Sequence, residues 1–254
     1  MSSEVVELFD RVADRYDEVL PFFAAFGRLC VDRLPAPGPG DRLLDVGAGR
    51  GAIAVGARAR GFTVTATDAS PGMVRRLKQE HPDLDARVMD AGKLDFEDDT
   101  FDVATAGFVM HLLDDPPAGV REVKRVLKPG GLFAFTGPGR VPDGFEFADG
   151  ADALFAEFAQ YLPPRGGMGE PFEEMDELAA AGFTGIDETD LRIELAVPDA
   201  ETFWQWLQTH GTRKFVDDLP AERRAEFRAR LIADLEAREH IVLRKYAWLY
   251  RGWA

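Results

Sequence analysis

The chain has 254 residues, 46% hydrophobic and 30% charged, a balance typical of a soluble globular protein long enough for one large domain. Its 45 acidic residues outnumber the 30 basic ones and give a net charge of −15, which argues against a nucleic-acid partner, because binding to phosphates depends on lysine and arginine. A single cysteine excludes an intrachain disulfide and a multi-cysteine metal site, and no other ligand spacing points to a metal.

The hydrophobic runs and the N-terminus predict where the protein works. No run of 18 apolar residues occurs that could cross a membrane. Met1–Glu4 lacks the basic start and the apolar stretch of a signal peptide. We therefore expect a cytoplasmic protein, a monomer or homodimer, with a small-molecule partner and no membrane partner.

The first 40 residues predict an N-terminal helical cap. Apolar residues recur at spacings of four and three over residues 4–20, which indicates an amphipathic helix: Val5, Phe9, Val12, Tyr16 and Leu20. A second apolar segment, Phe22–Leu34, ends at a stretch of alternating proline and glycine, Pro35–Gly40. This punctuation separates the cap from the rest of the chain.

From Arg42 onward, strand-like and helix-like segments alternate. The strand-like runs are Leu43–Val46, Thr63–Thr67, Ala86–Met89, Phe101–Ala106 and Leu132–Thr136. The helix-like segments are Ala52–Arg60, Met73–Glu80 and Ala118–Leu127. Alternation of this length predicts right-handed βαβ units and a parallel sheet covered on both faces.

Beyond Thr136 the alternation is interrupted twice. An aromatic-rich segment at 138–170 precedes a short helix (Phe172–Ala180) and a strand (Phe183–Val197). A second interruption at 199–239 carries helices at Glu201–His210 and Ala221–Glu239, and Ile241–Tyr250 forms a last strand. The sequence predicts an α/β fold: a doubly wound, Rossmann-like, mostly parallel seven-stranded sheet. We expect a cap at 1–40 and one domain at 41–254 that contains both helical insertions.

The segment Leu43–Gly51, LLDVGAGRG, carries the clearest functional signal. A buried strand ends in it, and three alternate glycines open an alanine-rich helix, so bare backbone can approach a nucleotide-like ligand. Asp68 follows the next strand, where a carboxylate can accept both hydroxyls of a ribose. Gly47-x-Gly49-x-x-Ala52 also satisfies the dinucleotide fingerprint, so this motif alone leaves a nicotinamide-dependent reductase open.

The wider context resembles the class I S-adenosylmethionine-dependent methyltransferases, in the small-molecule branch that includes ubiquinone/menaquinone C-methyltransferases and natural-product methyltransferases. Five segments carry the resemblance in order: Leu44–Gly51, Thr67–Met73, Val88–Ala91, Phe101–Ala104 running into Val109–Asp114, and Val126–Leu132. The resemblance covers residues 42–137 closely and Phe9–Asp17 loosely. It implies S-adenosylmethionine as the cofactor.

The resemblance also implies which residues bind the cofactor. The turn of Gly47, Ala48 and Gly49 would pass beneath the methionine part, with Gly107 near the sulfonium and Tyr16 folded over the methionine end. Asp68 would bind the ribose, and Ala69 and Met73 would line one adenine face. Asp90 would accept a hydrogen bond from the adenine amine, and Ala91 would offer its backbone amide to the ring.

Simpler structural interpretations stay open for several of these residues. Asp68 could cap the helix that begins near Pro71, because aspartate caps helices well. Asp90 could be an ordinary loop carboxylate. Tyr16 lies on the apolar face of its predicted helix, so it could serve core packing alone.

We predict methyl transfer to an apolar or aromatic small molecule, on oxygen, nitrogen or carbon, in secondary-metabolite or quinone-like biosynthesis. A hydroxyl or amine acceptor must lose a proton, and His210 and His111 are the candidate bases, although either could be a packed structural histidine. We expect the N-terminal cap (Tyr16, Phe22, Phe23 and Phe26) and the two insertions, with Phe155, Phe158 and Trp206, to form an aromatic acceptor pocket. Alternatives are the nicotinamide-dependent reductase and a non-catalytic S-adenosylmethionine-binding protein.

Overall fold

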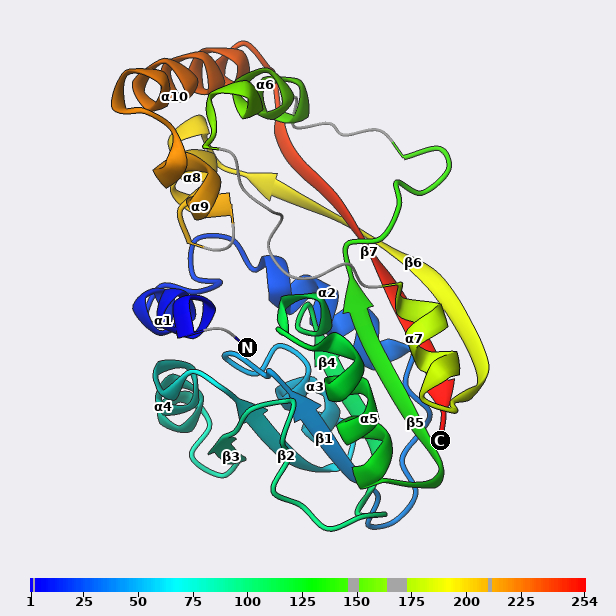
Figure 1. The fold of residues 1–254 in the computed structure, drawn as a ribbon. Helices are drawn as coiled ribbons and strands as arrows, with labels where there is room; N and C mark the ends of the chain where they lie inside the picture. Colours follow the sequence, from blue (N-terminus) through cyan, green and yellow to red (C-terminus); the bar gives the residue numbers. More distant parts are fainter. Residues whose placement is uncertain (2, 146–150, 164–172, 210–211) are drawn as a thin grey trace.

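The computed structural model describes residues 1, 3–145, 151–163, 173–209 and 212–254 (Figure 1). At its centre is a seven-stranded sheet in the order β3-β2-β1-β4-β5-β7-β6. Its strands are β1 (Arg42–Val46), β2 (Thr63–Asp68), β3 (Asp85–Val88), β4 (Phe101–Gly107), β5 (Leu127–Gly137), β6 (Thr184–Val197) and β7 (Ile241–Trp253). The first five pair in parallel, and β7 runs antiparallel between β5 and β6. The predicted mostly parallel sheet is confirmed.

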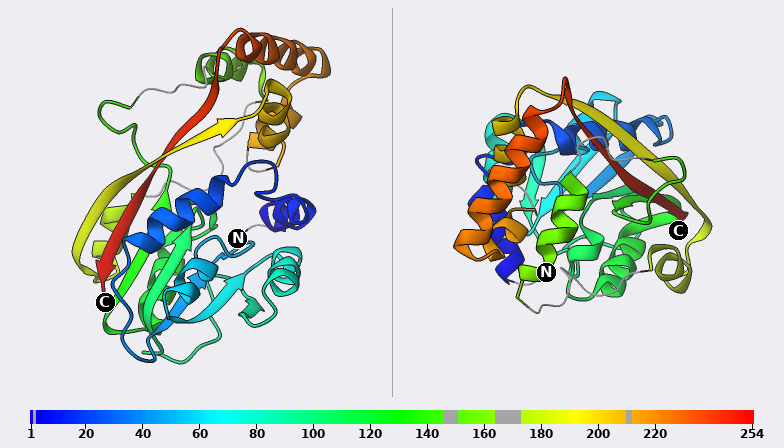
Figure 2. Two further views of the ribbon diagram at one scale, coloured as in Figure 1. Left: turned by 180° about the vertical axis from the view of Figure 1, so that it is seen from behind. Right: turned by 90° about the horizontal axis from the view of Figure 1, so that it is seen from above.

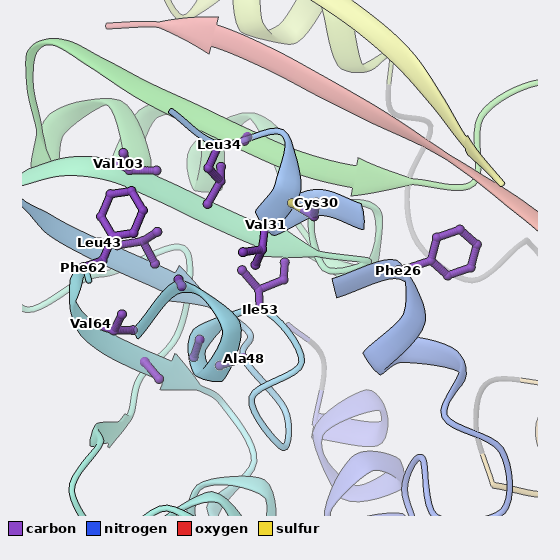
Figure 3. Close-up of a cluster of buried hydrophobic side chains, with 14 of the residues drawn as sticks. Phe26, Cys30, Val31, Leu34, Leu43, Ala48, Ile53, Phe62, Val64 and Val103 are labelled. Carbon is purple, nitrogen blue, oxygen red and sulfur yellow. The ribbon is translucent and has the colours of Figure 1, made fainter. Parts of the chain in front are cut away.

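Helices cover both faces of the sheet, as a doubly wound fold requires. One face holds α2 (Phe22–Asp32), α3 (Ala54–Ala59) and α4 (Pro71–Glu80), whose apolar side chains join those of β1 and β2 in one buried cluster. In Figure 3, Cys30 and Val31 of α2 lie beside Ile53, which precedes α3. The other face holds α5 (Pro116–Val126) and α7 (Glu174–Ala180). The helices change face between β1 and β4, which is where such folds bind ligands.

The N-terminal helix is shorter than the apolar spacing predicts. Helix α1 spans Ser3–Val12, and residues 13–18 form turns instead of continuing to residue 20. Asp17 has a left-handed backbone (φ 59°), and its carboxylate accepts hydrogen bonds of 2.8 Å from the amides of Phe23 and Ala24. The chain turns here because Asp17 satisfies amides of the first turn of α2 that have no helical partner.

The last two strands extend past the rest of the sheet and carry a helical layer. Only Trp248–Trp253 of β7 pair with β5, whereas β6 and β7 continue as a two-stranded ribbon (Figures 1 and 2). Beyond the ribbon lie α6 (Ala151–Phe158), α8 (Ala200–Leu207), α9 (Thr212–Asp218) and α10 (Ala221–Glu236). We call these four helices the cap layer. Within the described ranges, no helix is long and apolar enough to cross a membrane.

The aromatic residues predicted to line the acceptor pocket lie in the core of the cap layer. Phe158 is fully buried and meets the ring of Phe227 edge-on at 5.3 Å, and Phe155 meets the same ring at 5.2 Å. Trp206 is buried against Phe22, with 5.4 Å between ring centroids. None of the three lines the cavities described below: Phe158 and Trp206 are buried and Phe155 is half-buried beside α10, so their place in an acceptor pocket stays a prediction.

Candidate active site

The glycine turn leaves bare backbone at the carboxyl end of β1. Gly47, Gly49 and Gly51 have φ values of 64°, 55° and 89°, which residues with a Cβ adopt only under strain. A Cβ on Gly47 would lie 2.3 Å from a methyl of Val109, whereas a Cβ on Gly49 would meet nothing closer than the Tyr16 ring at 3.8 Å. Gly47 is therefore required by packing, and Gly49 leaves open space in front of the turn.

That open space is a cavity of about 410 Å³ between the glycine turn, α2 and the ends of β4 and β5. A second hollow of about 40 Å³ lies toward α1 and α4. Five residues line both, which makes them two parts of one cleft: Tyr16, Gly47, Gly49, Gly107 and Phe108. The predicted Tyr16, Gly47, Gly49 and Gly107 are thus brought together.

Tyr16 and Phe108 stand between the two hollows. The Tyr16 ring stacks on Phe23 at 4.7 Å, and burial raises the pKa of its hydroxyl well above the usual value. Phe108 has a φ of 58°, an unusual backbone conformation for a residue with a large side chain, and its amide donates to the carbonyl and the hydroxyl of Thr136 at 3.1 Å. No sequence motif indicated Phe108, since positive φ was expected only at glycines.

Asp68 connects the glycine turn to α4. Its two carboxylate oxygens accept hydrogen bonds of 2.8 Å from the amides of Gly49 and Ser70. Ser70 itself is the N-cap of α4, because its hydroxyl accepts from the Met73 amide at 3.1 Å. The alternative in which Asp68 caps α4 is therefore wrong. Burial raises the pKa of Asp68, as expected for a carboxyl group held in a cleft.

Of the next three predicted residues, Ala48 lines the larger cavity, Met73 lines the smaller hollow and Ala69 lines neither. Ala48 is buried, and its amide donates to the Thr67 carbonyl at 2.8 Å, which ties the turn to β2. Ala69 is half-buried between Asp68 and the N-cap of α4. Met73 is buried beneath α1, in contact with Val12 and Ala13.

Asp90 and Ala91 follow β3 at the rim of the site. Ala91 is buried, whereas the Asp90 side chain is 54% exposed. Asp90 accepts a hydrogen bond from the Gly92 amide at 2.9 Å and lies 3.5 Å from the amino group of Met1. That amino group also lies 3.4 Å from Asp114, so the start of α1 occupies the place predicted for the adenine amine.

Of the two candidate bases, the structure describes only His111. His210 lies outside the described residues. His111 lies in the short 3₁₀-helix Met110–Leu112, and its Nδ1 is buried with no hydrogen-bond partner among the described residues. Burial lowers the pKa of His111 to about 4, so it is neutral at pH 7, and it lines neither hollow. Nothing in this geometry brings His111 to the cleft.

Asp45 is the titratable group that the sequence analysis left without a role. It is almost completely buried at the end of β1 and lines the larger cavity. Its carboxylate accepts from the Thr105 hydroxyl at 2.8 Å and from the Ala54 amide at 3.0 Å. Burial raises its pKa to about 7, although these two hydrogen bonds act in the opposite direction. Its place directly before the glycine turn was the signal available in the sequence.

Arg50, in the glycine turn, fastens residues 13–18 over the site. It donates to the Tyr16 carbonyl at 2.7 Å and to Glu18 at 3.0 Å, and it also pairs with Glu80. Arg76 of α4 joins the same two carboxylates, at 3.5 Å and 2.9 Å. The glycine turn therefore also holds residues 13–18 beside the cleft.

We expect Arg50→Gln to loosen residues 13–18 without unfolding the protein. The ion pairs are partly exposed, so their loss should cost at most about 1 kcal/mol of unfolding free energy. The carbonyl of Tyr16 loses its donor, and trypsin should then cut after Arg15 faster than in the wild type. Arg87→Gln, which removes the ion pair with Asp85 on β3 and the contact of Arg87 with the Phe96 ring, both away from residues 13–18, is the control. Equal cleavage rates in all three proteins would show that Arg50 does not hold this segment.

The fold and the site together define a class of protein. A doubly wound sheet carries a bare glycine turn, a carboxylate at the end of the neighbouring strand and a cavity where the helices change face. This arrangement is typical of enzymes that bind a nucleoside cofactor at the carboxyl end of the sheet.

Comparison with known proteins identifies the family. A family model described as a methyltransferase domain matches residues 44–135. The nocamycin O-methyltransferase of Saccharothrix syringae is 34% identical over 253 residues, which cover 91% of this chain and 90% of that protein. The demethylmenaquinone methyltransferase of Renibacterium salmoninarum is 39% identical over 133 residues, 50% of this chain and 56% of that protein. The chain belongs to the S-adenosylmethionine-dependent methyltransferases, which confirms the resemblance.

Solved structures agree with the fold. The phosphoethanolamine N-methyltransferase 2 of Haemonchus contortus, in complex with phosphomonomethylethanolamine and S-adenosylhomocysteine, matches with a TM-score of 0.52 at 18% identity. The match covers 90% of this chain and 52% of that one, and at this identity it concerns the fold alone.

Proposed function

We propose that the cleft binds S-adenosylmethionine, with the methionine part on Gly47, Ala48 and Gly49 and the ribose at Asp68. The observation that carries this proposal is the open space in front of Gly49, next to a buried carboxylate at the end of β2. Gly107 would lie near the sulfonium, since it lines both hollows. Ala69, Met73, Asp90 and Ala91 would surround the adenine.

The adenine end requires a local rearrangement. The hollow beside Met73 has a volume of only about 40 Å³, and Met1, Val6 and Phe9 of the N-terminal segment line it. An adenine that reached Asp90 would have to displace the Met1 amino group from its carboxylate. We therefore expect the start of α1 to shift when the nucleoside binds, while residues 13–18 stay fastened through Arg50.

S-adenosylmethionine, when bound, supplies a methyl group activated by the positive charge on sulfur. The protein's part is then to align the acceptor and to exclude water. Tyr16 and Phe108 are placed for both tasks, because their rings lie between the two hollows. Three carboxyl groups of the described residues line the larger cavity, Asp17, Asp45 and Glu80, and are the candidates to balance the charge of the methionine ammonium.

We propose that the acceptor is an apolar or aromatic small molecule methylated on a hydroxyl oxygen. The relative named for O-methylation aligns over nearly the whole chain, whereas those named for demethylmenaquinone align over about half. Large apolar side chains line the larger cavity: Phe23, Phe26, Ile53 and Phe108. We also propose that the protein is a monomer or homodimer in the cytoplasm. It should have no nucleic-acid partner, which the net charge of −15 supports.

The hydroxyl should be an acidic one, such as a phenol or enol. Of the histidines that the structure describes, only His81 lines the larger cavity, where it ends α4 on the Arg50 side. A phenol or enol loses its proton to water more easily than an alcohol, so it needs less help from a base. His210 stays a predicted base, and His210→Ala with unchanged transfer to a phenol would remove it from the mechanism.

Asp68→Asn tests the cofactor proposal. Loss of a charge-assisted hydrogen bond to ribose should weaken binding of S-adenosylhomocysteine by about 1.5–3 kcal/mol, at least about tenfold. Asparagine keeps one oxygen for the Gly49 or Ser70 amide, so it disturbs the turn less than alanine would. Calorimetric titration measures the affinity, and thermal unfolding reports whether the variant is folded. An unchanged affinity in a folded variant would remove Asp68 from the site.

Labelled methyl transfer tests the acceptor proposal. We expect transfer from S-adenosylmethionine to phenols or enols and none to matched aromatic amines or methyl ethers. Mass spectrometry of the product places the new methyl group. Exclusive carbon methylation, as the relatives named for demethylmenaquinone would suggest, would contradict the oxygen assignment. No transfer to any acceptor by a protein that binds the cofactor would favour the non-catalytic alternative.

A further inference from the structure

A second, polar hollow lies on the far side of α1 from the cofactor cleft. It has a volume of about 120 Å³ and lies between α1 with its following turn and the α8–α9 region of the cap layer (Figures 1 and 2). We call it the seam. Three arginines, two glutamines, a threonine and a valine line it: Arg11, Arg15, Arg213, Gln205, Gln208, Thr209 and Val12. It shares no residue with the cleft.

The arginines of the seam have few negative partners. Among the described residues, no carboxylate forms an ion pair with Arg11 or Arg15, although acidic residues outnumber basic ones 45 to 30 in the chain. The nearby Asp14 pairs with Arg76 at 3.6 Å, away from the seam. Asp217 pairs with Arg213 at 3.1 Å, and within the described part of the chain it is the one carboxylate that pairs with an arginine of the hollow. Arg11 lies in the last turn of α1 and Arg15 in the turns that follow it, and both side chains line the same hollow.

The remaining polar groups of the seam are suited to an acceptor-rich ligand. The Gln208 amide donates one hydrogen to the Trp204 carbonyl at 3.3 Å, which leaves a second, and no hydrogen bond of the Gln205 side chain is found among the described residues. Thr209 already donates to the Trp206 carbonyl at 2.8 Å. Each guanidinium offers up to five N–H groups in a planar fork that matches the oxygens of phosphate.

We propose that the seam binds a phosphate group, either inorganic phosphate or the monoester of a small metabolite. The negative charge of the ligand pairs with Arg11 and Arg15, which have no carboxylate partner among the described residues. The ligand also accepts hydrogen bonds from the side-chain amides of Gln205 and Gln208 in the cap layer. It thereby links α1 to α8. Because α1 leads directly into Tyr16, a bound phosphate holds the cap layer against the segment that covers the cofactor cleft.

The experiment uses the full chain and measures phosphate binding, with no need for methyl transfer. Calorimetry and thermal unfolding are run with inorganic phosphate, phenyl phosphate and acetate at constant ionic strength. We expect phosphate to bind and to raise Tm, and Arg11→Gln/Arg15→Gln to weaken binding at least about tenfold. Arg75→Gln/Arg121→Gln removes two exposed arginines elsewhere and should leave binding unchanged. Tighter binding of phenyl phosphate assigns the site to a monoester, and equal binding assigns it to free phosphate.

Gln205→Glu provides a test that does not depend on removing the arginines. A carboxylate in the seam should raise Tm in the absence of phosphate and abolish the further rise that phosphate causes. The proposal is wrong if the wild type binds neither phosphate, if acetate binds as tightly, or if the two double variants lose affinity equally. It is also wrong if Gln205→Glu lowers Tm and phosphate still binds.

Discussion

Gly49→Ala is expected to weaken binding of S-adenosylhomocysteine by about 10–100-fold while the protein stays folded. The new methyl group would meet no protein atom closer than 3.8 Å, so the empty cleft accommodates it. It would project into the space in front of the turn, where overpacking typically costs about 1–3 kcal/mol. A cost of about 1.4–2.8 kcal/mol, within that range, corresponds to a loss of about 10–100-fold in affinity. The left-handed backbone at residue 49 adds a separate cost of about 1–2 kcal/mol to folding.

Gly40→Ala is the matched control. Gly40 also has a left-handed backbone (φ 85°), a Cβ there would meet nothing within 4 Å, and it lies outside both hollows. The two variants should lose similar unfolding free energy in urea, and only Gly49→Ala should lose cofactor affinity in calorimetry. Normal affinity in Gly49→Ala would mean that the nucleoside does not approach this backbone.

The second large effect concerns stability and pH. The carboxyl group of Asp45 titrates near pH 7 in the folded protein and near 3.8 when unfolded, because burial disfavours its charge. Its contribution to stability is complete below pH 4 and is lost as pH rises toward 7, since the unfolded chain ionises first. At about 1.4 kcal/mol per pKa unit, the unfolding free energy of the cofactor-free protein should fall by up to about 4 kcal/mol over this range.

Asp45→Asn should remove most of this decline. The amide can accept from the Ala54 amide and donate to the Thr105 hydroxyl, which can turn toward the Leu44 carbonyl. Urea unfolding at several values between pH 4 and 8 gives the slope. Asp85→Asn is the control: the hydrogen bond from Arg87 lowers the pKa of Asp85, so this carboxylate stays ionised in both states above about pH 5 and its loss should leave the slope intact. A wild-type stability that is flat or rises over this range would contradict the buried state of Asp45.

The sheet could be predicted from the sequence because its signals are local. Short apolar runs alternate with helical segments, and each βαβ unit has one hand, so a parallel sheet covered on both faces follows. The glycine turn was predictable for the same reason, because positive φ favours glycine. The helix predicted over 4–20 ends early, at Val12. The Asp17 carboxylate accepts hydrogen bonds from two amides of α2, and the apolar spacing of residues 4–20 contains no sign of this contact with the next helix.

The cap layer and Asp45 show what local patterns leave out. Aromatic residues on an amphipathic helix can line a ligand pocket or pack into a core, and the sequence pattern is the same in both cases. In the structure, Phe155 and Phe158 pack into the cluster between α6 and α10. For Asp45, the sequence gives a carboxylate at a strand end, but its raised pKa comes from burial by elements far along the chain. The glycine turn and Asp68 were predicted from the residues themselves, whereas the roles of Tyr16, Ala69, Met73, Asp90, Ala91 and Gly107 came from the resemblance.

Calorimetric titration of the wild-type protein with S-adenosylmethionine, S-adenosylhomocysteine, NADH and NADPH tests the central claim most directly. We predict micromolar binding of the two sulfur nucleosides and none of the nicotinamide cofactors. Binding of a nicotinamide cofactor, or no binding of either sulfur nucleoside by the folded protein, would contradict the roles proposed for the glycine turn, Asp68 and Asp90.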